Sequence, residues 1–322
     1  MNITAQNKKF PYMLFWWTVI ILVLIFIPVL TEDIYTIHIL NLLGIYILLT
    51  TGLNLVLGVC GQISVGHAGF WGLGAYASSL MTIKLGANFW IGFLASGLVG
   101  VVAAYMIGPV LRLRGHVLAV ATIAFGEIVR LVLLNWISLT NGPAGLYNMP
   151  YPSLGFITLD TEHSFYYLIL VCVLLNIMVL NRLIHSRMGK RWMAIRGDEE
   201  AAESLGVHPT KYKIYAFAVA GFSAGIAGSL YAHLTSYISP HIFTLHESIK
   251  MLTMVVVGGE GSVGGAIIGA IVLVFTSEYS RYLQEYSLIP YGLALLLFLI
   301  FAPKGLIDLL ARGLRLFVRK KA

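Results

Sequence analysis

The sequence predicts an all-α, polytopic integral membrane protein with about 8–10 transmembrane helices, one or more glycine-broken segments, and both termini in the cytoplasm. Three observations predict this class. The first is composition: 58% of the 322 residues are hydrophobic, 11% are charged and the mean hydropathy is +0.85. Soluble domains carry about 25% charged residues, so a soluble fold could not cover this much apolar surface. Composition therefore excludes a soluble enzyme and a disordered protein.

The second observation is a series of apolar segments, each near the roughly 20 residues that span a bilayer. The first segment follows Lys8 and Lys9, as in a signal peptide, but no small-residue cleavage site comes after it. We therefore expect an uncleaved first span whose N-terminus is cytoplasmic. The nine segments are 14–30, 37–59, 63–83, 89–111, 115–137, 164–181, 213–234, 249–276 and 288–302.

The third observation is the placement of the 21 Lys and Arg residues, which explains the net charge of +7 without a nucleic acid partner. Most of them lie near the N-terminus, at 112–114, in the loop 185–212 and near the C-terminus. Basic loops remain on the cytoplasmic side of a membrane. Nine crossings would place the basic tail 307–322 outside, so we expect an even number of crossings.

Segment 249–276 restores an even number if it is broken. It is too long for one upright span, and the glycine-rich stretch 258–265 interrupts it. We expect either two half-helices that meet at this break or two short spans. Irregular backbone at membrane depth is tolerated only where it is buried in protein or lines a cavity. The break therefore indicates a translocation path.

Two glycine motifs resemble nucleotide sites and are rejected. The pattern Gly259-x-Gly261-x-x-Gly264 matches a dinucleotide fingerprint, but its flanks are membrane segments rather than a βαβ unit. The stretch 61–68 resembles a phosphate-binding loop but has His67 and Ala68 where lysine and serine or threonine are required. We find no clustered catalytic or metal-ligating set. The sequence therefore predicts a protein that is not an enzyme and has no metal site and no cofactor of its own.

Glycine-rich stretches supply the candidate residues for a translocation path. Close helix packing explains small residues equally well, and the two readings are not exclusive. A Ser-Val-Gly sequence occurs at 64–66 and again at 262–264, which hints at an internal repeat. The candidates are Asn54, Ser64, Gly66, His67, Gly259, Gly261, Ser262 and Gly264.

Ionisable residues inside the membrane are functional candidates by default. Glu127 and Arg130 lie three residues apart on one helix face, so we expect a structural ion pair. A proton-coupled carrier would instead show lone carboxylates in several spans. Glu247 and Lys250 fall near a predicted span end, where we expect them to reach water.

The cytoplasmic loop 185–212 carries a short helix signal. Asp198 is a good N-cap, Glu199 and Glu200 suit the positive end of a helix, and Gly206 is a good stop. The predicted helix has about two turns, which is too short to be stable alone. We expect a partner to dock on it, although an ordinary solvated surface helix is the alternative.

At this loop the sequence resembles a known family, the LivM-type permeases of branched-chain amino acid ABC importers. The resemblance is carried by "SRMGKRWMAIRGDEEAAESLGVHPTKYKIYAFAVAGFSAGIAGSLYA" (186–232), "GLNLVLGVCGQISVGHAGFWGLGAY" (52–76) and "MVVVGGEGSVGGAIIGA" (254–270). The outer "TNGPAGL" (140–146) and the late "FAPKGL" (301–306) also fit. It covers nearly the whole chain, and Gly197 is its one evident departure from the family pattern.

The resemblance implies a permease for leucine, isoleucine and valine in a bacterial inner membrane. It implies a second homologous permease, two ATPase subunits that carry ATP and Mg²⁺, and a periplasmic solute-binding protein. It also implies one permease domain, 1–322, with a periplasmic loop at 138–163 and a cytoplasmic tail at 307–322. The residues matching the ATPase-coupling motif are Arg196, Asp198, Glu199, Glu200, Ala201, Ala202 and Gly206. A urea or other small-solute permease of the same family and a self-sufficient secondary transporter remain as alternatives.

Overall fold

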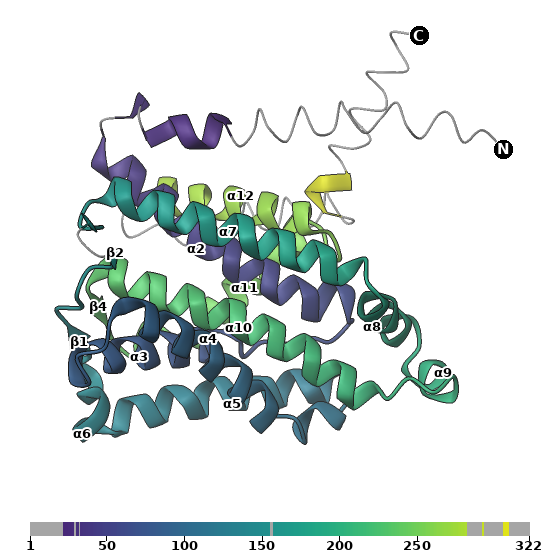
Figure 1. Cartoon of the computed structure of the whole chain (residues 1–322). Coiled ribbons are helices and arrows are strands. Elements are labelled where there is room, and N and C mark those ends of the chain that lie inside the picture. Colours follow the sequence, from purple (N-terminus) through teal and green to yellow (C-terminus); the bar gives the residue numbers. More distant parts are fainter. Residues whose placement is uncertain are drawn as a thin grey trace, which may run out of the picture.

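A computed structural model describes residues 22–28, 30–31, 33–154, 157–281, 292 and 305–308, and almost all of its regular structure is helical (Figure 1). The long helices lie side by side, and only two-residue strands accompany them. The longer helices are α2 (Ile34–Asn54), α3 (His67–Lys84), α4 (Phe89–Met106), α5 (Gly115–Asn135), α7 (Glu162–Ile184), α8 (Arg187–Gly197), α10 (Pro209–Thr235), α11 (Leu245–Gly258) and α12 (Val263–Arg281). The shorter elements are η2 (Leu55–Val59), η3 (Val110–Arg112), α6 (Ile137–Thr140), η4 (Gly142–Ala144), β1 (Leu146–Tyr147), β2 (Ser153–Leu154), β3 (Ile157–Thr158), α9 (Glu199–Ser204) and β4 (Tyr237–Ile238).

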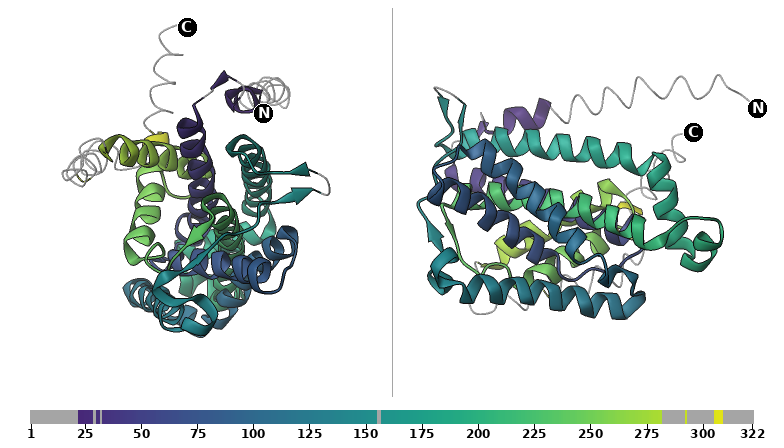
Figure 2. Two further views of the ribbon diagram at one scale, coloured as in Figure 1. Left: turned by 90° about the vertical axis from the view of Figure 1, so that its left-hand side faces the viewer. Right: turned by 60° about the horizontal axis from the view of Figure 1, so that its bottom comes forward.

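Helix α10 is the centre of the bundle and packs against α3, α4 and α2. Its glycines allow this close approach. A Cβ atom on Gly74 of α3 would lie 2.3 Å from the Cα of Gly225, and one on Gly100 of α4 would lie 2.0 Å from the carbonyl oxygen of Gly221. Small residues at such contacts let helix backbones approach one another within a membrane. Helices α7 and α12 lie with α2 on the other side of α10 (Figures 1 and 2).

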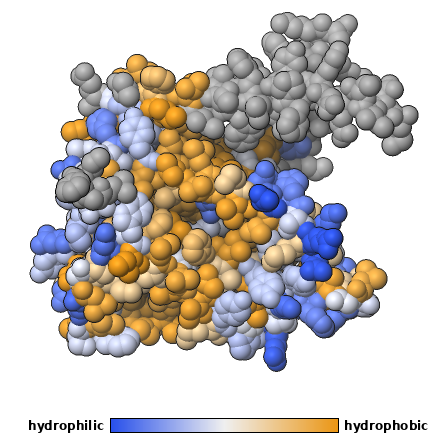
Figure 3. Space-filling view, viewed as in Figure 1, coloured by the Kyte–Doolittle hydropathy of each residue, from blue (hydrophilic) through white to orange (hydrophobic). Residues whose placement is uncertain are grey.

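Five of the described helices are long and apolar enough to cross a membrane, and α2 continues through the π-helical turn η2 as one 26-residue span. The pair α11 and α12 passes the same test together but is bent by 120° at its break. The predicted break in 249–276 is therefore present. Figure 3 shows a broad apolar band on this face between two more polar ends, as expected for a bundle that spans a bilayer.

Some predicted boundaries were wrong because turns interrupt the apolar runs. The predicted segment 63–83 becomes helical only at His67, because residues 61–66 are not helical. The predicted segment 89–111 ends as a helix at Met106, and a 3-10 turn follows. Hydropathy alone does not distinguish these apolar turns from helix.

The two ends of the bundle differ in structure (Figure 1). Helices α8 and α9 project from one end. At the other end, β1 pairs antiparallel with β4, with Leu146 opposite Ile238, and β2 pairs with β3. The β1–β4 pairing ties the predicted outer loop 138–163 to the segment after α10, whereas the β2–β3 hairpin projects from the bundle (Figure 2).

Several predictions fall largely outside the described residues. They are most of the first span, 14–30, the last span, 288–302, and the basic tail 307–322. Within the first span, residues 22–28 are helical and lie against α7. The hydroxyl groups of Tyr166 and Tyr167 donate hydrogen bonds to the carbonyl oxygens of Leu24 and Ile25.

Candidate functional site

The predicted coupling loop, 185–212, begins with helix α8, Arg187–Gly197, which sequence analysis did not predict. The Ser186 hydroxyl accepts a hydrogen bond from the Met188 amide at 3.1 Å and so caps α8. Trp192 is fully buried, and its indole N–H donates to the Tyr212 carbonyl at 2.8 Å. This bond ties α8 to the start of α10, so the loop leaves the membrane bundle through a fixed hairpin.

Helix α9 has the cap that the sequence predicts. One carboxylate oxygen of Asp198 accepts hydrogen bonds from the amides of Glu200 and Ala201, at 2.9 and 3.0 Å. The helix ends before Gly206, whose φ of +84° lies in the left-handed region that favours glycine. Ala202 is buried, whereas the side chains that follow it are exposed.

The acidic face of α9 is bound to the rest of this chain, a feature that sequence analysis missed. Arg114, which precedes α5, contacts the carboxylates of Glu199 at 3.3 Å, Glu200 at 2.7 Å and Glu203 at 3.6 Å. Lys213 of α10 is fully buried and its ammonium lies 2.8 Å from Glu199. These ion pairs hold α9 in one position relative to α5 and α10.

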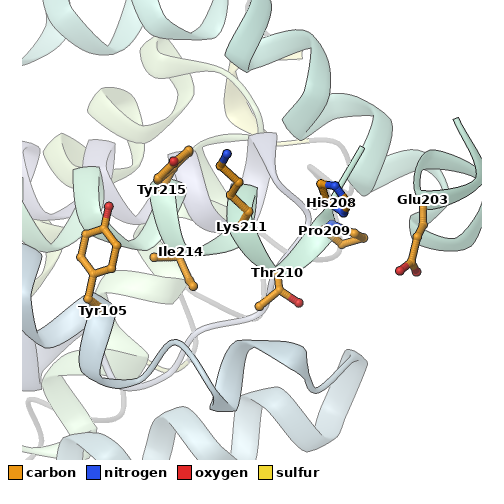
Figure 4. Close-up of a pocket in the computed structure, with 8 residues that line it drawn as sticks. All are labelled: Tyr105, Glu203, His208, Pro209, Thr210, Lys211, Ile214 and Tyr215. Atoms are coloured by element: carbon orange, nitrogen blue, oxygen red, sulfur yellow. The ribbon is translucent and has the colours of Figure 1, made fainter. Parts of the chain in front are cut away.

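Part of the surface around α9 is open. Leu205 is 85% exposed and Met193 of α8 is 47% exposed. A cavity of about 420 Å³ lies between α9, the start of α10 and the end of α4 (Figure 4). It is lined by Tyr105, Glu203, His208, Pro209, Thr210, Lys211, Ile214 and Tyr215. The exposed Leu205 at the end of α9 and this hollow are both surfaces that a partner can cover.

Arg196 contacts this chain rather than standing free on the loop. Its guanidinium donates a hydrogen bond to the carbonyl of Gly58 and lies 3.8 Å from the carboxylate of Glu260. A Cβ atom on Gly61 would meet Arg196 at 2.8 Å, and one on Gly261 would meet it at 2.7 Å. Two glycine-rich breaks interrupt the helices: the first lies between η2 and α3, and the second lies between α11 and α12. Arg196 therefore connects the predicted coupling loop to both breaks.

The two breaks also contact each other directly. A Cβ atom on Gly58 would lie 2.1 Å from the amide nitrogen of Gly261, so only glycine fits there. The Asn54 side-chain oxygen accepts a hydrogen bond from that same amide at 2.8 Å. The path candidates Asn54 and Gly261 are thus brought together across 207 residues of sequence.

The other candidates divide between the two breaks. Near α3, Gly66 packs against the carbonyl of Thr122, and the buried Ser64 Oγ and His67 Nε2 atoms have no hydrogen-bond partner among the described residues. At the second break, Gly259 has φ of +123°, Ser262 accepts a hydrogen bond from the Gly265 amide at 3.3 Å, and Gly264 lies against Ile307. The structure therefore does not gather all eight candidates at one point.

The ion pair predicted between Glu127 and Arg130 of α5 is confirmed. The Arg130 Nε atom donates to both carboxylate oxygens of Glu127 at 3.0 Å. The Glu127 side chain is nevertheless 43% exposed, near the middle of the span Gly115–Asn135. A charge at that depth does not favour lipid contact, so this side of α5 faces protein or water.

Comparison with known proteins decides the family. A family profile described as "Branched-chain amino acid transport system / permease component" matches residues 35–302. The chain belongs to this permease family. The match includes both glycine breaks, the coupling loop and the site residues discussed above.

Curated relatives agree with that assignment. The permease is 38% identical to the "High-affinity branched-chain amino acid transport system permease protein LivM" of Escherichia coli over 87% of this chain and 72% of the relative. It is 38% identical to LivM of Salmonella typhimurium over 84% of this chain and 70% of the relative. It is 26% identical to LivH of Salmonella typhimurium over 81% of this chain and 91% of the relative. No solved structure matches significantly.

Proposed function

We propose that this chain is the permease subunit of an ABC importer for leucine, isoleucine and valine in a bacterial inner membrane. One observation carries the proposal: a membrane bundle of this family holds a capped, ion-paired helix, α9, outside its apolar band with an exposed leucine at its end. A helix of six residues is too short to be held for its own stability. Its rigid presentation supports a docking role for an ATPase subunit.

The partners follow from the same reasoning. Two ATPase subunits bind ATP and Mg²⁺ and contact α9, and a periplasmic solute-binding protein delivers the amino acid to the opposite end. The path runs between this chain and a second homologous permease. Similarity to both LivM and LivH, two differently named permeases of branched-chain amino acid transport, supports a pair of related chains.

A different solute is the second candidate, and one relative favours it. The "Fructose import permease protein FruF" of Bifidobacterium longum is 23% identical over 71% of this chain. The same permease architecture thus serves an unrelated solute, and a urea-type solute falls in the same class. A self-sufficient carrier has less support, because α9 would then have no function.

The test is a gentle detergent purification of the chain from its native membrane, followed by mass spectrometry and transport assays. We expect a second permease and an ATPase in comparable amounts, and ATP-dependent leucine uptake after reconstitution. Uptake that continues without ATP, by the chain alone or as a homo-oligomer, would contradict the importer assignment. Uptake of another solute in place of leucine would contradict only the substrate.

A further inference from the structure

An ion pair on α11 lies deeper than its place in the sequence indicates. Glu247 and Lys250 occupy the first two turns of this helix, and both bind the hydroxyl group of Tyr46. That hydroxyl donates to Glu247 at 2.8 Å and accepts from Lys250 at 3.0 Å. Tyr46 stands at the middle of the span Ile34–Val59. The two charges therefore lie at membrane depth, and the prediction that they reach water at a span end was wrong.

This ion pair is open. The Glu247 carboxylate and the Lys250 ammonium are 3.9 Å apart, which is longer than a charge-assisted hydrogen bond of about 2.8 Å. Their side chains are 20% and 17% exposed. The ammonium also lies 4.5 Å from the centre of the Tyr46 ring, within the range of a cation–π contact. Tyr46 thus holds two opposite charges apart while leaving both accessible.

The pair on α5 gives the contrast. There, Arg130 donates to both oxygens of Glu127 and closes the pair. A closed pair satisfies its own charges, whereas the open pair on α11 keeps donor and acceptor capacity for another molecule. Charged residues at membrane depth that are not fully paired with each other mark solute pathways.

Aromatic rings surround the open pair on one side. The Trp71 ring lies 6.3 Å from Tyr46, 5.0 Å from Tyr231 and 4.9 Å from Phe243, measured between centroids. Trp71 is 2% exposed, and its buried indole N–H has no acceptor among the described residues. Buried tryptophan N–H groups usually have an acceptor, so this donor is available for a ligand.

We propose that Glu247, Lys250, Tyr46 and Trp71 form a binding site for the zwitterionic head of an α-amino acid during its passage. The solute ammonium binds Glu247, the solute carboxylate binds Lys250 and the Trp71 N–H, and the aliphatic side chain lies against the aromatic rings. The site has no net charge, so it suits a zwitterion and disfavours solutes with a net charge. This inference rests on the proposed function and assigns the solute chemistry to named residues.

The first experiment compares two glutamates that accept a hydrogen bond from a tyrosine of α2. Glu247 accepts from Tyr46, and Glu278 of α12 accepts from Tyr35. The full complex is reconstituted with ATP inside the vesicles, and the initial rate of leucine uptake and the rate of ATP hydrolysis are measured. We expect Glu247→Gln to lower uptake at least tenfold while the subunits still co-purify and hydrolyse ATP. Glu278→Gln should remain within twofold of the wild type.

The second experiment restores a charge at the site chemically. We expect Lys250→Cys to lose at least tenfold in uptake, and modification with aminoethyl methanethiosulfonate, which adds an ammonium group, to restore at least half of the wild-type rate. The neutral methyl reagent should not restore it, and treated wild-type complex should be unchanged.

Each other outcome decides the question. Uptake within twofold of wild type in both Glu247→Gln and Lys250→Cys would overturn the site, as would equal rescue by the neutral reagent. Failure of both variants to assemble, while Glu278→Gln assembles, would assign the pair to folding and also overturn it. If wild-type complex takes up no leucine with ATP, the proposed function itself fails, which is a different result.

Discussion

The buried ion pair between Lys213 and Glu199 gives the sharpest prediction about α9. The Lys213 ammonium is fully buried, and among the described residues it contacts Glu199 at 2.8 Å and the carbonyl oxygen of Leu113 at 3.3 Å. Glu199→Gln removes the only anion among these contacts. Breaking a buried pair from one side costs about 3–5 kcal/mol, because the remaining charge stays buried.

The lower end of this range applies here. The Glu199 side chain is 16% exposed, and a glutamine oxygen can still accept one hydrogen bond from the ammonium. We therefore expect a loss of about 3 kcal/mol, which shifts the equilibrium between bound and released α9 roughly a hundredfold toward release. Arg114 remains, but its contacts with Glu200 and Glu203 are more exposed and contribute at most about 1 kcal/mol each.

Hydrogen exchange of the α9 amides and leucine uptake measure this effect. In Glu199→Gln we expect faster exchange across Glu199–Ser204 and a large fall in uptake. The double variant Glu199→Gln with Lys213→Met removes the stranded charge, so it should recover most of the stability. Unchanged exchange in the single variant, or no recovery in the double variant, would refute the reasoning.

Three further predictions concern the same end of the molecule. Gly261→Ala places a Cβ atom 2.7 Å from Arg196 Nη1 at a φ of +81°, so we expect at least a tenfold loss of uptake, whereas Gly197→Ala, which meets nothing within 4 Å, should be unaffected. Arg196→Gln should leave ATP hydrolysis by the purified complex intact and lower the amount of leucine transported per ATP; a parallel fall in both would contradict a role in coupling. Leu205→Asp, at an 85% exposed position, should keep the melting temperature of the isolated chain but lose at least tenfold in co-purified ATPase; undiminished ATPase recovery would exclude this leucine from the docking surface.

Local signals made part of this structure predictable from sequence. The Asp198 cap depends on residues two and three positions away, and the break at 259–261 depends on consecutive glycines. Both are short-range effects of backbone hydrogen bonding and conformational freedom. The polytopic helical class is equally local, because it follows from the length and hydropathy of each segment.

Long-range contacts were not predictable in the same way. Lys213 lies 100 residues from Leu113, and nothing in its neighbourhood marks it as a buried partner of α9. Motif position places Arg196 in the predicted ATPase-coupling set, but it carries no information about the contacts that Arg196 makes with Gly58 and Glu260 of this chain. Contacts between distant segments depend on the packing of the whole bundle. The hydrophobic periodicity of one segment does not predict them.

The error at Glu247 has a more specific cause. Depth was estimated by counting from the ends of one long apolar segment, which assumes that the segment begins at the membrane surface. Helix α11 instead begins beside α3, where the Ser248 hydroxyl accepts a hydrogen bond from the Ala68 amide at 3.0 Å. A helix that begins within the bundle has its first turn at membrane depth. The hydropathy of the residues before it does not reveal that depth.

These contacts connect the two proposed sites through one short element. Helix α11 has 14 residues, a length of about 21 Å, and carries the zwitterion site on its first turns. Its other end is the glycine break, where Gly261 is held by Asn54 and by Arg196 of the coupling loop. If an ATPase docks on α9 as proposed, we expect a displacement of α9 to reach the break through α8 and Arg196, and a rigid α11 to carry it to Glu247 and Lys250. Coupling by this route requires Arg196. It does not require this chain to bind ATP.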